Sequence, residues 1–140
     1  MKSVLVDSGF WFALYDEGDE HNSTAIAIEK FLDSNIIVIP FPTLYESINT
    51  KFMKNKKAKN EFEKILKRNN TKIISDESIK NDALEITFTN KSVERKLSLV
   101  DNIIRLILSD INYRIDCLIT FNTKDFIDIC AKRNIEILDK

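Results

Sequence analysis

Short runs rich in isoleucine and valine alternate along this chain with longer stretches of helical periodicity. Most of the runs are continuously apolar, which is typical of strands that are buried on both faces of a parallel sheet. The alternation predicts an α/β domain in three layers, with a central parallel sheet and helices on both faces. The predicted strands span residues 4–7, 36–40, 72–74, 115–120 and 135–138, and the predicted helices span about 22–34, 43–54, 57–69, 76–89, 98–112 and 123–133.

The length of 140 residues suits a single domain over residues 1–140, and 44% apolar with 31% charged residues is typical of a globular protein. No apolar run is long enough for a transmembrane helix, and the start of the chain does not resemble a signal peptide. Cys117 and Cys130 do not form a CxxC pair, so we expect no disulfide framework and a cytoplasmic location.

Charge is distributed unevenly although the net charge is only −1. Residues 1–50 carry 2 basic and 8 acidic side chains, whereas residues 51–72 carry 9 basic and 2 acidic ones. An acidic first third followed by a basic segment predicts a cation site and an anion-binding surface in one domain. Alternatively, the basic segment 51–72 is only the solvated face of a helix.

Polar residues gather where the predicted sheet should bind a ligand. Open α/β sheets bind ligands beyond the carboxyl ends of their strands, where the strand order reverses. Asp7 ends the first predicted strand and Thr120 and Asn122 end the fourth, while Glu46 and Asp101 lie on the first turns of two predicted helices. Clustered carboxylates repel each other unless a cation is present, and oxygen ligands suit Mg²⁺ or Mn²⁺. A single histidine excludes a multi-histidine zinc site.

Two of these acids also have structural interpretations. Glu46 could complete a capping box with Thr43, and Asp101 could complete a similar one with Ser98 or pair with Arg105 one turn later. The helix over 98–112 has such a wide apolar surface that we expect it to be close to buried. A carboxylate on its first turn therefore needs a partner.

The remaining candidates differ in how easily a structural role explains them. Asn122 or Thr123 could simply cap the last helix. Asp7 is the hardest to explain structurally, because it is an ionisable residue that closes an apolar strand. His21 is expected to have a surface or structural role.

An aromatic cluster follows Asp7 directly, at residues 10–12. Most of it should belong to the core, although one of the three rings could stack on a base.

Four segments in order resemble the PIN-domain family, and among its members the compact VapC-like toxin ribonucleases. The segments are VLVDSGFWFAL, TLYESINT, LSLVDNIIRLIL and LITFNTKDF, and their order and intervals fit over residues 3–138. The resemblance implies a doubly wound sheet with strand order 3-2-1-4-5. It also implies Mg²⁺- or Mn²⁺-dependent hydrolysis of RNA phosphodiester bonds, a role as the toxin beside a small antitoxin protein, and a homodimer.

The resemblance assigns roles to individual residues. It implies that Asp7 and Asp101 are metal ligands, and that Glu46 holds a metal or its water. It further implies that Thr120 orients the loop after the fourth strand, and that Ser8 supports Asp7 through a hydrogen bond.

The chain departs from the family pattern at Asn122, where the family often has an acid. An asparagine offers a carbonyl oxygen but no charge, and Asp125 could replace the missing carboxylate if the turn folds inward. Asp125 could equally be a helix first-turn carboxylate.

The departure at Asn122 leaves a second function open, a PIN-fold RNA-binding or scaffold module that does not cleave. In either case the basic segment 51–72 is expected to guide RNA to the site, chiefly through Lys54, Lys56, Lys57 and Lys59. A phosphatase or receiver-like domain is a weaker alternative, because it needs a lysine beside the acids that we cannot place in the sequence.

Overall fold

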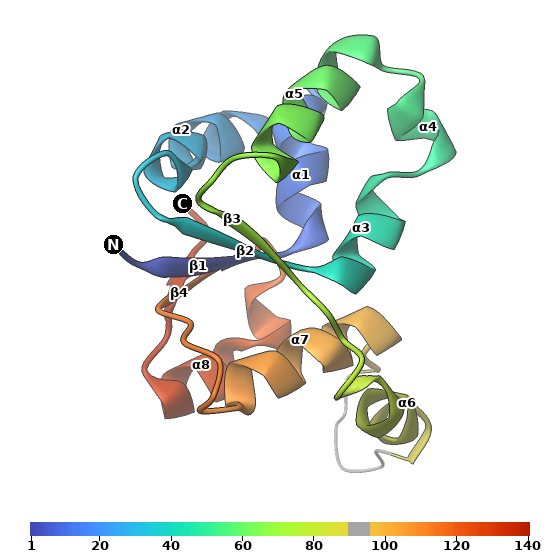
Figure 1. Ribbon diagram of the computed structural model, residues 1–140, viewed down its shortest axis with the longest axis vertical. Helices are drawn as coiled ribbons and strands as arrows, with labels where there is room; N and C mark the ends of the chain where they lie inside the picture. The colour runs from blue at the N-terminus through green and yellow to red at the C-terminus, as the bar shows by residue number, and fades with distance from the viewer. Residues whose placement is uncertain (90–95) are drawn as a thin grey trace.

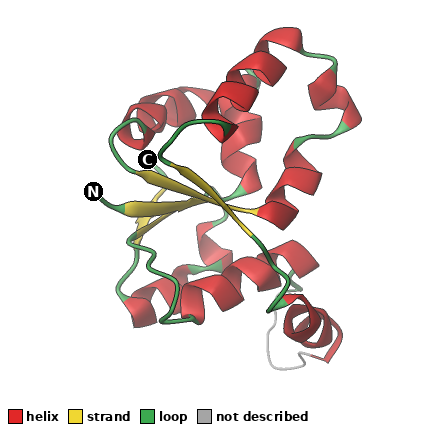
Figure 2. Cartoon of the chain, in the orientation of Figure 1, coloured by secondary structure: helices red, strands yellow, loops and turns green. Residues whose placement is uncertain are grey.

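The computed structural model describes residues 1–89 and 96–140, and it contains one parallel sheet of five strands (Figure 2). The strands lie in the order β3-β2-β1-β4-β5, which confirms the predicted order. Their bounds are β1 Ser3–Val6, β2 Ile36–Pro40, β3 Thr71–Ile74, β4 Cys117–Ile119 and β5 Glu136–Leu138. Each differs from its predicted range by at most two residues at either end, the usual uncertainty of strand boundaries.

Helices cover both faces of the sheet, as the alternation predicted (Figure 1). One layer contains α1, α2 and α5, and the opposite layer contains α6, α7 and α8. The bounds are α1 Ser8–Tyr15, α2 Asn22–Leu32, α3 Phe41–Ser47, α4 Thr50–Met53, α5 Lys56–Leu66, α6 Lys80–Thr89, α7 Leu99–Ser109, the 3₁₀ helix η1 Thr123–Asp125, and α8 Ile127–Arg133. No helix in the described ranges is long and apolar enough to cross a membrane.

Alternate residues of each central strand point into two separate cores. Val4 and Val6 of β1 pack with α1, α2 and α5, whereas Leu5 packs with α7 and α8. This division follows from the two-residue period of a strand, and it explains why the central strands must be apolar on both sides. All four residues of β1 are buried. Cys117 and Cys130 are both buried and form no disulfide.

Helix α1 was not predicted from the sequence. Five of its eight residues are buried, so apolar side chains surround it and no polar stripe marks a helical period. Asp7 provides the local signal for its start, because the Asp7 side chain accepts a hydrogen bond from the Ser8 N–H and caps the helix. The next two residues, Ser8 and Gly9, are poor helix formers, so the sequence does not indicate that a helix begins there.

The predicted helix over 43–54 is wrong, because the chain forms two helices there. The Asn49 side chain accepts a hydrogen bond from the Phe52 N–H at 2.9 Å, so it starts α4 as a new helix. The predicted helix over 123–133 likewise divides into η1 and α8.

The prediction that the helix over 98–112 is close to buried is also wrong. Helix α7 ends at Ser109 and buries one face against the sheet. Leu99, on its first turn, is 39% exposed, and Ile111, just beyond its end, is 83% exposed. A helix in the outer layer of a three-layer domain has only one side to bury.

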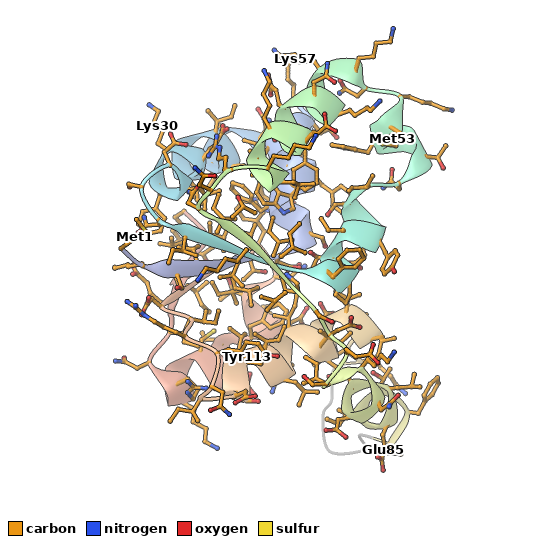
Figure 3. The ribbon with its side chains drawn as sticks, in the orientation of Figure 1. Met1, Lys30, Met53, Lys57, Glu85 and Tyr113 are labelled. Atoms are coloured by element: carbon orange, nitrogen blue, oxygen red, sulfur yellow. The ribbon has the colours of Figure 1, made fainter. Side chains whose placement is uncertain are left out.

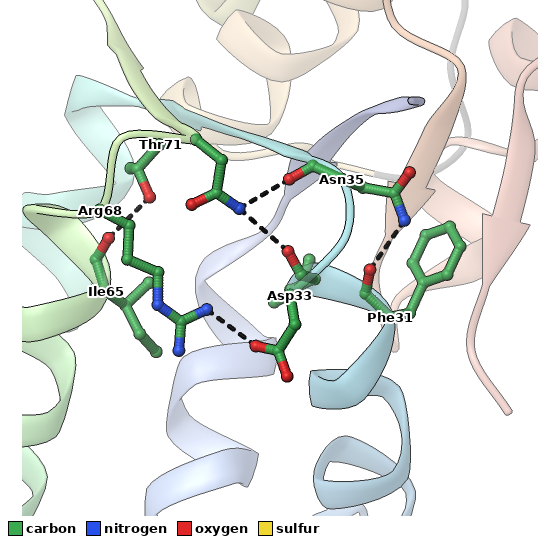
Figure 4. A network of polar contacts seen from close by, with 8 residues as sticks. Phe31, Asp33, Asn35, Ile65, Arg68 and Thr71 are labelled. Carbon is green, nitrogen blue, oxygen red and sulfur yellow. Dashed lines mark hydrogen bonds and ion pairs between the residues drawn. The ribbon is translucent and has the colours of Figure 1, made fainter.

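Hydrogen bonds fasten the amino-terminal edge of the sheet (Figure 4). The Asn70 side-chain amide donates to the carbonyls of Leu32 and Asn35, and Arg68 pairs with Asp33 at 3.0 Å. These contacts join the connection between α2 and β2 to the connection between α5 and β3. The opposite edge, where the strands end, carries the polar residues expected from the sequence.

Candidate active site

Asp7 lies at the point where the strand order of the sheet reverses, between β1 and β4. It follows β1 directly, and the Thr120 hydroxyl, just after β4, donates a hydrogen bond to Asp7 Oδ2 at 3.0 Å. The Ser8 N–H donates to Asp7 Oδ1 at 2.8 Å. Asp7 is only 4% exposed and Thr120 is fully buried, so the carboxylate is held rigidly at the ligand-binding edge of an open α/β sheet.

The surroundings of Asp7 disfavour its negative charge. The pKa of Asp7 is raised from its ordinary value of 3.8 to about 6. Burial is the largest cause and the negative charges of Asp101 and Glu46 add to it, while the hydrogen bonds from Thr120 and Ser8 oppose the rise. The two charged neighbours that shift this pKa are therefore both acidic. A cation in the crevice would relieve this repulsion.

Glu46 approaches Asp7 from α3 through Ser8. The Ser8 hydroxyl donates to Glu46 Oε1 at 2.8 Å, so Ser8 contacts one acid with its N–H and another with its hydroxyl. Glu46 is exposed but in part covered, and this partial burial raises its pKa; the hydrogen bond from Ser8 opposes the rise, and the charge of Asp101 adds to it.

The capping box expected between Glu46 and Thr43 does not form. Helix α3 begins at Phe41 with Pro40 as its N-cap, and the Thr43 hydroxyl donates to the Pro40 carbonyl at 2.7 Å. Proline 42, on the first turn, favours this earlier start.

Asp101 lies on the first turn of α7 and caps that helix, as one interpretation of the sequence predicted. The Asp101 N–H donates to the Ser98 hydroxyl at 3.1 Å, and the Ser98 N–H donates to Asp101 Oδ2 at 3.3 Å. Its charge nevertheless raises the pKa values of Asp7 and Glu46, so Asp101 lies within electrostatic range of both. The alternative pairing with Arg105 is wrong, because Arg105 binds both carboxylate oxygens of Asp128 at 2.7 Å.

The segment after β4 separates Asn122 from Asp125. The Asn122 N–H donates to the Thr120 hydroxyl at 3.0 Å, while the Asn122 side chain is exposed and makes no capping bond to η1. The capping role considered for Asn122 is therefore wrong. Asp125 lies beside Arg105, whose guanidinium donates to the Asp125 carbonyl at 2.8 Å. The Thr123 hydroxyl, the other capping candidate, donates to Asp139 instead.

The carboxylates of the candidate site are of the type that binds a hard cation, but their side chains are not arranged around one. Asp7, Glu46 and Asp101 offer the carboxylate oxygens that Mg²⁺ and Mn²⁺ prefer. Within residues 1–89 and 96–140, however, no group of three or more His, Cys, Asp or Glu side chains is placed to hold a metal ion. Glu46 accepts a hydrogen bond from the Ser8 hydroxyl, and Asp101 accepts one from the Ser98 N–H.

The four lysines expected to bind RNA are all exposed. Lys54 follows α4, and the other three lie on α5, which buries only Ala58, Phe62 and Ile65. In Figure 3, Lys57 and Met53 lie at the outer end of the region formed by α4 and α5, away from the sheet. The lysines are thus available to an anion and do not belong to the core.

A contact between His21 and Phe121 was not anticipated from the sequence. The two rings stack in parallel, with centroids 4.3 Å apart and planes 6° apart, next to Thr120. Nothing in the sequence around either residue indicates the pairing, because the two residues are far apart in the sequence.

No family model and no curated protein matches the chain. Among solved structures, it is similar to the crystal structure of Mycobacterium tuberculosis VapC20, which is described as a sarcin–ricin loop cleaving toxin. The similarity has a TM-score of 0.69 at 18% identity, and it covers 89% of this chain and 94% of that chain. With the same layers and the strand order 3-2-1-4-5, the chain has a PIN-like fold.

Proposed function

We propose that this protein is a Mg²⁺- or Mn²⁺-dependent endoribonuclease that hydrolyses RNA phosphodiester bonds. The observation that supports it most is the buried Asp7 carboxylate, which Thr120 holds at the reversal point of the sheet. Burial raises its pKa most, and the charged side chains that add to this rise, Asp101 and Glu46, are both acidic. A carboxylate kept in such a place destabilises the fold, and such residues are typical of functional sites.

In this proposal Asp7 and Asp101 are the metal ligands, with Glu46 as a third donor. A bound divalent ion supplies an activated water and neutralises charge that develops on the phosphate. Thr120 keeps one Asp7 oxygen in place, and Ser8 sets the distance between Asp7 and Glu46. Glu46, which is exposed, could accept a proton from the attacking water. Asn122 and Asp125 are the remaining candidates for completing the site.

We further propose that the protein is the toxin of a toxin–antitoxin pair. The likeness to VapC20, a toxin that cleaves the sarcin–ricin loop, supports this role. The proposal includes a cytoplasmic location, a small antitoxin partner and a homodimer. Sedimentation of the purified protein would test the homodimer.

Cleavage of a labelled RNA with Mg²⁺, with Mn²⁺ and with a chelator tests the enzyme function. Asp7→Asn should abolish cleavage. Asp82→Asn is the control: it removes the same negative charge at an exposed position on α6, and it should leave cleavage unchanged. Cleavage that persists in the chelator, or that survives Asp7→Asn, would refute the assignment.

A non-cleaving RNA-binding module remains the second candidate. It is favoured by the exposed, uncharged Asn122 and by the lack of a preformed metal group in the described residues. Such a module should bind the labelled RNA equally with and without divalent ions, and it should produce no fragments.

A further inference from the structure

A pocket of about 450 Å³ lies between α1 and α4, beside the candidate active site. This volume falls in the range of sites for small molecules. Aromatic and polar side chains line the pocket together, namely Phe12, Tyr15, Asp16, Asn49, Lys51, Phe52 and Asn55.

Phe62 of α5 supports the aromatic part of the lining. Tyr15 and Phe52 contact each other with ring centroids 5.9 Å apart, and both contact Phe62 of α5, at 6.0 and 5.7 Å. Phe12 differs from its neighbours Phe10 and Trp11, which are fully buried, because 37% of Phe12 is exposed. The ring of Phe12 is therefore only partly packed in the core, and it lines the pocket.

The polar part of the lining offers groups that a ligand could use. Asp16, Asn49 and Asn55 line the pocket with a carboxylate and two side-chain amides. Lys51 adds a positive charge, and it is the first residue of the basic segment 51–72.

Two links connect the lining of the pocket to the candidate active site. Ser8, which binds Glu46, and Phe12 are four residues apart on α1, so they share a helix face about 6 Å apart along the axis. On the other side, the Asn49 amide donates to the Glu46 carbonyl at 3.1 Å. A chain of nucleotides bound at Glu46 would therefore reach this pocket with an adjacent unit.

We propose that the pocket binds one base of single-stranded RNA next to the cleaved phosphate. The base would stack on Phe12, its polar edge would meet the side-chain amides of Asn49 and Asn55, and Lys51 would contact a neighbouring phosphate. This inference rests on the proposed function and adds to it that the substrate is unpaired at this position. The mixture of aromatic rings, amides and a lysine favours a base over an apolar protein segment.

Binding of a short, labelled single-stranded RNA tests the inference without cleavage. The measurements use the Asp7→Asn protein, whose RNA complex should be stable, as the common background. Phe12→Ala should weaken binding about tenfold, because one base-stacking ring is lost. Phe12→Tyr should retain binding, since it keeps the ring. Phe88→Ala serves as the matched control, because Phe88 is 82% exposed on α6, on the other side of the sheet.

A second set of RNAs, each with one base removed, identifies the bound position. One abasic position should weaken binding to the background protein about tenfold and should have no further effect in Phe12→Ala, because both changes remove the same contact. Equal binding of the background and Phe12→Ala proteins would overturn the inference and would favour a protein segment as the occupant. That result would leave the nuclease proposal intact if the wild-type protein still cleaves RNA. A wild-type protein that neither binds nor cleaves RNA would overturn both proposals.

Discussion

Replacing Asp7 by Asn should make the metal-free protein more stable at neutral pH. Burial raises the pKa of Asp7 from 3.8 to about 6, so the folded protein binds this proton more tightly than the unfolded chain does. Ionised Asp7 therefore destabilises the fold, fully above about pH 6 and not at all well below pH 3.8. About two pKa units correspond to about 3 kcal/mol.

Asparagine keeps the shape of the side chain without the charge. Its carbonyl oxygen can still accept from the Ser8 N–H, and its amide can donate to the Thr120 hydroxyl. The gain in the free energy of unfolding should therefore approach about 3 kcal/mol near pH 8, or about 10 °C in Tm. It should fall towards zero near pH 4, where Asp7 of the wild type is itself mostly protonated.

Urea unfolding of both proteins in a chelating buffer, at a series of pH values, measures this difference. Asp82→Asn, at an exposed position, controls for the general effect of removing one negative charge. If Asp7→Asn is no more stable than wild type near pH 8, or if the gain is the same near pH 4, the charge of Asp7 is not the cause. The argument from burial and acidic neighbours would then be refuted.

Three further predictions concern cations and RNA. Mn²⁺ should raise the Tm of the wild type by mass action and should fail to raise that of Asp101→Ala; an equal rise would restrict Asp101 to its capping role. The four exposed lysines expected to bind RNA are Lys54, Lys56, Lys57 and Lys59. When they are changed to Gln, RNA binding should depend less steeply on ionic strength in salt titrations. An unaltered slope would show that these lysines do not contact the RNA. Calorimetry should show tighter Mn²⁺ binding for Asn122→Asp, because the change adds a negative charge; equal affinities would place Asn122 outside the site.

The sheet was predictable from the sequence because its strands are short, apolar and buried on both faces. Val4, Leu5 and Val6 show the pattern best, since each is fully buried and the two faces need equal hydrophobicity. Helix α1 was not predictable by the same means. It is buried on most sides, and its apolar residues therefore lack the polar stripe that identifies an outer helix.

The candidate site was predictable at the level of the backbone and not at the level of side chains. The order of the strands places Asp7 beside Thr120 whatever their rotamers are. The bond between the Ser8 hydroxyl and Glu46, and the position of Asp125 beside Arg105, depend on side-chain rotation and on the path of short connections. No periodicity in the sequence records these choices.

The hydrogen bonds among Asp33, Arg68 and Asn70 have a consequence for how such a protein can evolve. They hold the sheet together at the edge opposite Asp7, away from the residues that would face an RNA. The exposed positions of α3 and α4 other than Glu46 can therefore accumulate substitutions under selection for a new target while the sheet beneath them persists. Related chains should vary most at these positions, and they should preserve Glu46 and the hydrogen bonds at the opposite edge.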